Sequence, residues 1–90
     1  MTIKRFSVYG RVQGVAFRFY TLREAEKLGV KGYVRNCNDG SVEVIAKADE
    51  QTMAQFEQWL HHGSPSANVE RVIASDYSGG ENFERFEIRR

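Results

Sequence analysis

Residues 33–47 read YVRNCNDGSVEVIAK, and this stretch decides the fold. Two runs typical of β-strands, Tyr33–Asn38 and Ser41–Lys47, flank the dipeptide Asp39-Gly40. Asp-Gly between two such runs is among the strongest short-range signals for a β-hairpin. Apolar residues of the second run alternate with other residues, the period that a half-buried strand requires: Val42, Val44 and Ala46. We therefore predict an antiparallel hairpin in the middle of the chain.

A helical pattern lies on either side of this hairpin. Before it, from about Arg18 to Leu28, apolar residues recur at helical spacing, and Gly29 is suited to end the helix. After it, Asp49 is suited to cap a second helix that ends at Gly63-Ser64-Pro65. The expected apolar stripes are Leu22, Ala25 and Leu28 in the first helix and Met53, Phe56 and Leu60 in the second.

Three further strand-like runs complete the chain. Ile3–Tyr9 comes first, with Phe6 and Val8 expected on its buried face. Val69–Asp76 and Phe83–Arg89 come last, separated by a turn at Ser78-Gly79-Gly80. The order β-α-β-β-α-β-β predicts an α+β fold of the ferredoxin-like, split βαβ type. Its sheet is expected to be mostly antiparallel, with the two helices covering one face.

Length and composition narrow the class of protein. A chain of 90 residues is expected to form one domain, residues 1–90. A net charge of +1 provides no bulk attraction to nucleic acid or anionic lipid, so we expect neither partner. No apolar run approaches the length of a membrane span, and the N-terminus lacks a secretory signal, which predicts a cytoplasmic monomer.

No residue cluster in the sequence points to a metal or a cofactor. Cys37 is the only cysteine, so neither an internal disulfide nor a cysteine-built zinc site can form. His61 and His62 are adjacent near the end of the second predicted helix, where they point in different directions. We therefore expect no metal and no cofactor.

The segment from Gly10 to Arg18, GRVQGVAFR, carries the clearest chemical signal. Gly10 and Gly14 can adopt backbone angles that other residues avoid, so the chain can curl around a guest. Its N–H groups would then point inward beside the positive end of the following helix dipole. Arg18 adds a planar, charged fork suited to phosphate or carboxylate oxygens. The segment predicts an anion cradle.

Two motifs make the chain resemble the acylphosphatase family. GRVQGVAFR at residues 10–18 is similar to the family's signature loop, and GYVRNCNDGSV at residues 32–42 matches a second motif at the expected distance. The resemblance implies that Arg18 binds the substrate and that Asn36 orients a water molecule. It also implies that the loop residues donate backbone N–H groups to the phosphoryl oxygens: Gln13, Gly14, Val15, Ala16 and Phe17.

The function implied is hydrolysis of small acyl phosphates to a carboxylate and inorganic phosphate. A carboxylate is a weak base and leaves without a general acid, and phosphoryl transfer depends mostly on positioning and charge stabilisation. Arg18, the N–H cradle and a water held by Asn36 are therefore a sufficient set of groups. The alternative is a non-catalytic module that binds phosphate or another small anion, because the cradle alone would suffice for binding.

Two other classes of function fit the sequence poorly. No Lys-Ser or Lys-Thr follows Gly14, so the loop is not the phosphate-binding loop of a nucleotide hydrolase. An RNA-binding module of this fold needs aromatic residues on its central strands, and Ser41–Lys47 has none. The aromatic residues after the loop are expected to pack in the core rather than stack on a ligand: Phe17, Phe19 and Tyr20.

Overall fold

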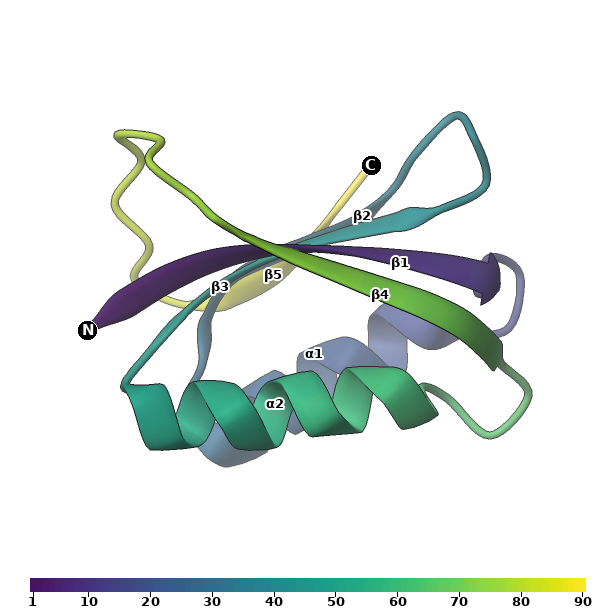
Figure 1. Ribbon diagram of the computed structural model, residues 1–90, viewed down its shortest axis with the longest axis horizontal. Helices are drawn as coiled ribbons and strands as arrows, with labels where there is room; N and C mark the ends of the chain where they lie inside the picture. Colours follow the sequence, from purple (N-terminus) through teal and green to yellow (C-terminus); the bar gives the residue numbers. More distant parts are fainter.

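A computed structural model describes residues 1–90 and confirms the predicted order of elements and the α+β fold. Five strands form one sheet, and both helices cover the same face of it, which produces the two layers seen in Figure 1. Neither helix is long and apolar enough to cross a membrane. The elements are β1 (Thr2–Arg11), α1 (Phe17–Leu28), β2 (Lys31–Asn36), β3 (Val42–Ala48), α2 (Glu50–His62), β4 (Asn68–Asp76) and β5 (Phe86–Arg89).

The strands lie in the order β4-β1-β3-β2-β5, and only the pair β2 and β5 is parallel. β1 and β3 occupy the centre, where Phe6 pairs with Val44 and Val8 with Val42. These four side chains are fully buried beneath the helices. The apolar alternation read from the sequence is thus the face that forms the core.

Local signals at the helix ends are confirmed. The Asp49 carboxylate accepts a hydrogen bond of 2.7 Å from the Thr52 N–H and caps α2. Gly29 ends α1 in the left-handed conformation, and its N–H donates to the carbonyls of Ala25 and Glu26. The buried stripe of α1 differs from the predicted one, because Thr21 and Phe17 are buried with Ala25 while Leu22 and Leu28 lie partly buried at the margin.

The hairpin forms, but its loop is longer than the two residues that Asp39-Gly40 would require. β2 ends at Asn36 and β3 begins at Val42, so the predicted strands Tyr33–Asn38 and Ser41–Lys47 extended too far toward the turn. The Asp39 carboxylate accepts hydrogen bonds from the Ser41 N–H and hydroxyl and holds the loop in shape. Asn36 therefore stands at the end of a strand rather than inside a turn.

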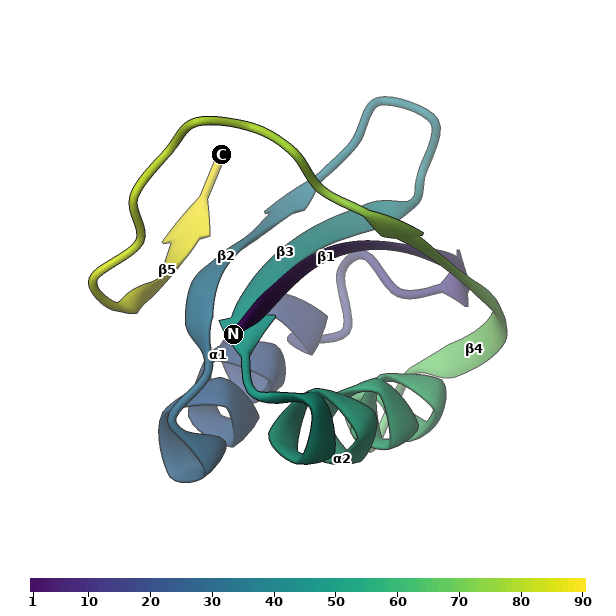
Figure 2. The same cartoon turned by 60° about the vertical axis from the view of Figure 1, so that its left-hand side comes forward.

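The last strand is shorter than predicted. β5 starts at Phe86 instead of Phe83, because residues 77–85 form a long connection between the two edges of the sheet (Figure 2). Phe83 packs on Tyr33 and Ile45, which form a small second cluster on the face away from the helices. Tertiary contacts thus override the strand pattern that the sequence shows at residues 83–85.

Candidate active site

The loop between β1 and α1 curls because two of its residues have positive φ angles. Gly14 has φ 75° and Ala16 has φ 60°, and Ala16 is the only residue other than glycine in that region. Alternation of left-handed with ordinary residues turns successive backbone N–H groups toward one point, the arrangement called a nest. An alanine in this conformation is strained, and such strain is concentrated at functional sites.

The backbone N–H groups from Gly14 to Arg18 donate to no acceptor in the protein. The N–H groups of Phe17 and Arg18 belong to the first turn of α1, and this turn contains no acidic residue that would neutralise the helix dipole. Consecutive unpaired N–H groups next to the positive end of a helix form an anion-binding concavity. The loop therefore has the unpaired backbone donors that the anion cradle predicted from the sequence would require.

Buried contacts hold the loop in this shape. The Ser64 hydroxyl, which is buried after the end of α2, donates a hydrogen bond of 2.8 Å to the Val15 carbonyl. The Phe17 side chain is buried against Trp59, with ring centroids 6.0 Å apart. These buried contacts fix the side of the loop that faces the core, so its N–H groups remain free on the opposite side.

Arg18 is the first basic residue of α1, and its side chain reaches back toward β5. Its Nη1 donates a hydrogen bond of 3.3 Å to the Arg89 carbonyl. No carboxylate pairs with it, although other arginines form ion pairs with Glu43, Glu81 or Glu87. A guanidinium has several further N–H donors, so Arg18 is positioned by one bond while its other donors are free for an anion.

Asn36 ends β2 with its side chain on the helix-covered side of the sheet, the same side as the buried Val34. Its Oδ1 is the one buried side-chain nitrogen or oxygen that has no hydrogen-bond partner. Leaving a buried polar atom unpaired costs about 1–3 kcal/mol, so a native structure rarely keeps one without a role. This oxygen can accept a hydrogen bond from a water molecule or a ligand in the adjoining pocket.

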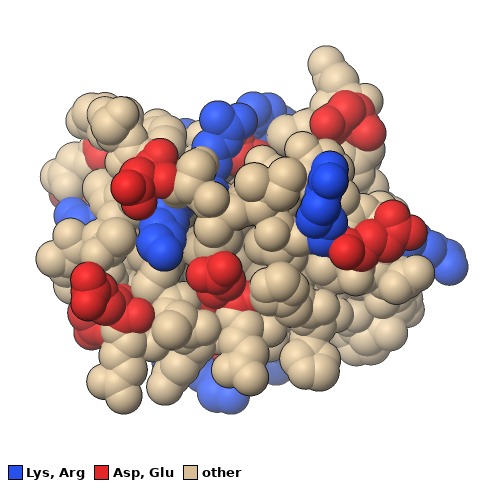
Figure 3. Space-filling model, in the orientation of Figure 1, with Lys and Arg blue, Asp and Glu red and all other residues tan.

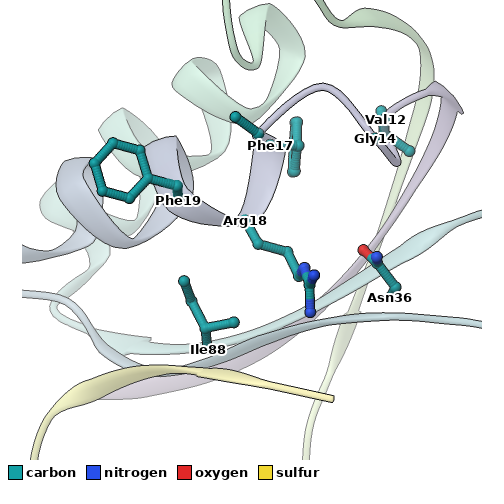
Figure 4. Close-up of a pocket in the computed structure, with 8 residues that line it drawn as sticks. Val12, Gly14, Phe17, Arg18, Phe19, Asn36 and Ile88 are labelled. Atoms are coloured by element: carbon teal, nitrogen blue, oxygen red, sulfur yellow. The ribbon is translucent and has the colours of Figure 1, made fainter.

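These residues surround one cavity of about 220 Å³ (Figure 4). The guanidinium of Arg18 and the amide of Asn36 extend into the same space beneath the loop, although the two residues belong to different elements. The lining residues are Val12, Gly14, Ala16, Phe17, Arg18, Phe19, Asn36 and Ile88.

Two residues predicted for the site do not line this cavity. Val15 points into the core. The side-chain amide of Gln13 instead donates to the carbonyls of Cys37 and Ser41, at 2.8 Å each, and so ties the loop to the β2–β3 hairpin. The motif places Gln13 in the loop, but only the tertiary structure shows what its side chain contacts.

The expectation that Phe19 packs in the core is wrong. Its side chain is 50% exposed and lines the cavity opposite Ile88, which is also exposed. Phe17 is buried as expected, and Tyr20 lies half-buried with its ring edge-to-face against Phe19. Phe19 follows Arg18 on the helix and therefore turns away from the core side that Phe17 occupies.

Charge is mixed on one broad face of the molecule. On the face shown in Figure 3, Lys and Arg side chains lie among Asp and Glu side chains, and neither sign forms a dominant patch. No group of three or more His, Cys, Asp or Glu side chains lies close enough to hold a metal ion. Because the net charge of the chain is only +1, attraction of an anion to this loop depends on its N–H groups and Arg18 rather than on a strong overall charge.

Comparison with known proteins identifies the family. A sequence model of the acylphosphatase family matches residues 4–88. The chain is 52% identical to an acylphosphatase of Actinobacillus pleuropneumoniae and 49% identical to one of Actinobacillus succinogenes, in both cases over the whole of each chain. Its fold is similar to the crystal structure of acylphosphatase from Bacillus subtilis, with a TM-score of 0.94, 36% identity and complete coverage of both chains.

The family model spans nearly the entire chain, and the two Actinobacillus relatives match it from end to end. Both motifs, residues 10–18 and residues 32–42, contribute residues to the lining of one cavity. This chain therefore belongs to the acylphosphatase family and is an enzyme of that family.

Proposed function

We propose that residues 1–90 act as a single, monomeric domain that hydrolyses the carboxyl–phosphate bond of acyl phosphates. Membership of the acylphosphatase family supports this activity. The observation that carries the mechanism is the cavity into which Arg18 and the unpaired Asn36 amide both extend.

The phosphoryl group binds in the loop. Backbone N–H groups from Gly14 to Arg18 donate to its oxygens, together with the free donors of the Arg18 guanidinium. The charge on those oxygens is spread out in the transition state, so donors fixed in advance stabilise it without reorganising. The hydrogen bond from Arg18 to the Arg89 carbonyl supports this role because it restricts the rotamers of a long side chain.

Asn36 positions the attacking water. Its Oδ1 accepts a hydrogen bond from that water, whose lone pair then points at phosphorus. The amide does not act as a base. Its contribution is the orientation of the nucleophile, and the proton that the water loses passes to a phosphate oxygen or to solvent.

The bond between phosphorus and the acyl oxygen breaks as the bond from water forms. The carboxylate leaves with the electron pair and needs no proton, since it is a weak base. The products are one carboxylate and one inorganic phosphate. A phosphate monoester has a far poorer leaving group, and this set of groups provides no acid to protonate it.

The test measures phosphate release from acetyl phosphate in the presence of excess chelator. We expect turnover by the unmodified protein and a loss of about a hundredfold to a thousandfold in kcat for Arg18→Ala and for Asn36→Ala. Matched controls are Lys27→Ala, an exposed cation at the other end of α1, and Asn38→Ala, an exposed amide in the hairpin loop. Both controls should keep nearly full activity.

Unchanged turnover in Arg18→Ala or Asn36→Ala would overturn the mechanism. Phosphate binding without turnover would instead favour the second candidate, a non-catalytic module for small anions, because the unpaired N–H groups alone suffice to bind phosphate.

A further inference from the structure

Two exposed apolar side chains meet at the cavity that holds Arg18 and Asn36. Phe19 is 50% exposed and Ile88 is 40% exposed, and both line this cavity. The other large apolar side chains with high exposure are Met1 and Ile73, and neither lies there. Single exposed apolar residues are ordinary, but a pair that converges at a binding cavity points to an apolar ligand group.

The exposed apolar pair and the Asn36 amide lie at opposite ends of the cavity. In Figure 4, Asn36 and Gly14 lie at one end, Phe19 and Ile88 lie at the other, and the Arg18 side chain extends between them. The aromatic end is held in place by its neighbours. The Tyr20 ring packs edge-to-face on Phe19 at 5.6 Å, and the Arg23 guanidinium stacks 5.8 Å from its centroid.

We propose that Phe19 and Ile88 form a subsite for the acyl group of the substrate and that it selects acyl phosphates with an apolar chain. This inference rests on the proposed function. In phosphoryl transfer the attacking and leaving oxygens lie roughly in line across phosphorus. If water attacks from Asn36 and the phosphoryl group sits at Arg18, then the carboxylate leaves toward Phe19 and Ile88. The chain attached to that carboxylate contacts these two side chains.

The chemistry of this end of the cavity defines the preferred substrates. Phe19 and Ile88 provide no side-chain hydrogen-bond donor or acceptor. A polar acyl group such as a carbamoyl group would lose water there and gain no partner, whereas a short aliphatic or aromatic chain would bury apolar surface. Phe19 and Ile88 remain partly exposed, so the subsite buries each methylene of the substrate only in part. Each added methylene is therefore expected to improve kcat/KM by about two- to fourfold.

The experiment compares acetyl phosphate with butyryl phosphate. The two carboxylates are nearly equally good leaving groups, so the ratio of their kcat/KM values reports contacts of the chain rather than intrinsic reactivity. We expect butyryl phosphate to be favoured by about four- to fifteenfold. Phe19→Ser and Ile88→Thr should each move this ratio toward one, and Ile73→Thr, an exposed isoleucine on β4, should leave it unchanged. Circular dichroism of each variant verifies that the fold is retained.

A binding measurement separates the subsite from catalysis. Calorimetry with butylphosphonate and methylphosphonate measures the same preference without hydrolysis, because the alkyl group takes the place of the leaving group. Tighter binding of butylphosphonate that is lost in Phe19→Ser supports the subsite even if no acyl phosphate is hydrolysed. The subsite would be overturned if all four proteins hydrolysed the acyl phosphates with the same butyryl-to-acetyl ratio of kcat/KM and bound the two phosphonates with equal affinity. The proposed function would still stand in that case.

Discussion

The side-chain amide of Gln13 donates a hydrogen bond of 2.8 Å to the main-chain carbonyl of Cys37, the residue that follows Asn36. The same amide donates a second bond of 2.8 Å to the Ser41 carbonyl. One side chain of the β1–α1 loop is thus tied to both ends of the β2–β3 loop. The segment expected to bind phosphate is thereby held at a constant position relative to the residue expected to orient water.

This relationship predicts that Gln13 is a positioning residue. Gln13→Leu removes both donors and is expected to reduce the free energy of unfolding by about 1–2 kcal/mol. A shift of Asn36 relative to the loop should lower kcat by about tenfold to a hundredfold, while phosphate affinity changes little because the backbone donors remain. Steady-state kinetics measures the loss in kcat, and competition by inorganic phosphate measures the change in phosphate affinity. Gln55→Leu, on the exposed side of α2, is the control. Equal losses in phosphate affinity and kcat would argue for a merely structural role.

The conformation of Ala16 predicts which substitutions the loop tolerates. Ala16→Val places a β-branched side chain at φ 60° and is expected to destabilise the fold by about 1–3 kcal/mol and to weaken phosphate binding. Ala54→Val, at an exposed position in α2, should cost only about 0.5 kcal/mol. Denaturant unfolding compares the two variants, and similar losses would contradict the strained conformation.

Glu43 is expected to stabilise the face of the sheet that lies away from the helices. Its side chain is only 7% exposed, and its carboxylate forms an ion pair with Arg5 at 2.7 Å and accepts a hydrogen bond from Arg35 at 2.6 Å. Glu43→Gln should lower the free energy of unfolding by about 1–3 kcal/mol, and the lower end is expected because both arginine side chains are partly exposed and solvent screens the pair. Glu87→Gln, which affects a half-exposed pair with Arg89 at 3.5 Å, should change it by less than about 0.5 kcal/mol. Thermal unfolding of the two variants distinguishes a buried acceptor from a surface one.

The lowered pKa of Asp39 predicts that this residue contributes less to stability at acidic pH. Hydrogen bonds from the Ser41 hydroxyl and N–H hold the pKa of its carboxyl below the ordinary value of 3.8. A carboxyl with a lowered pKa in the folded state contributes stability above its unfolded pKa and loses that contribution as pH falls through the folded value. The stability advantage of the unmodified protein over Asp39→Asn should therefore shrink as pH falls from about 4 downward.

Urea unfolding at several acidic pH values measures this advantage. Asp76→Asn serves as the control, because the Asp76 carboxylate accepts no hydrogen bond. A constant difference between the unmodified protein and Asp39→Asn across that range would show that the carboxylate is not stabilised by the hairpin loop.

Most of the fold could be predicted because its signals are local. The Asp49 cap, the Gly29 stop and the valine alternation in β3 each depend on residues within a few positions of one another. The extent of β5 could not be predicted in this way. Phe83 looks like a strand residue in sequence, but it packs across the sheet on Ile45, which no nearby residue indicates.

The candidate site was predictable in part. The glycines of the loop indicate a backbone that curls, and the resemblance of the two motifs to one family brings Arg18 and Asn36 into a single hypothesis. The sequence predicts that Phe19 packs in the core, because aromatic residues after a loop usually pack there. Its exposure depends on the direction in which the first turn of α1 faces, and that direction is set by the burial of Phe17.

By itself, the sequence determined the order of the elements, the capping of the helices, the curled loop and the family, because periodicity, turn chemistry and motif spacing are properties of the chain. The tertiary structure alone decided which atoms are left without partners. Asn36 keeps an unpaired oxygen, Gln13 ties two loops together, and Phe19 faces Ile88. Each of these facts depends on contacts between segments far apart in sequence, which the packing of helices on the sheet brings together.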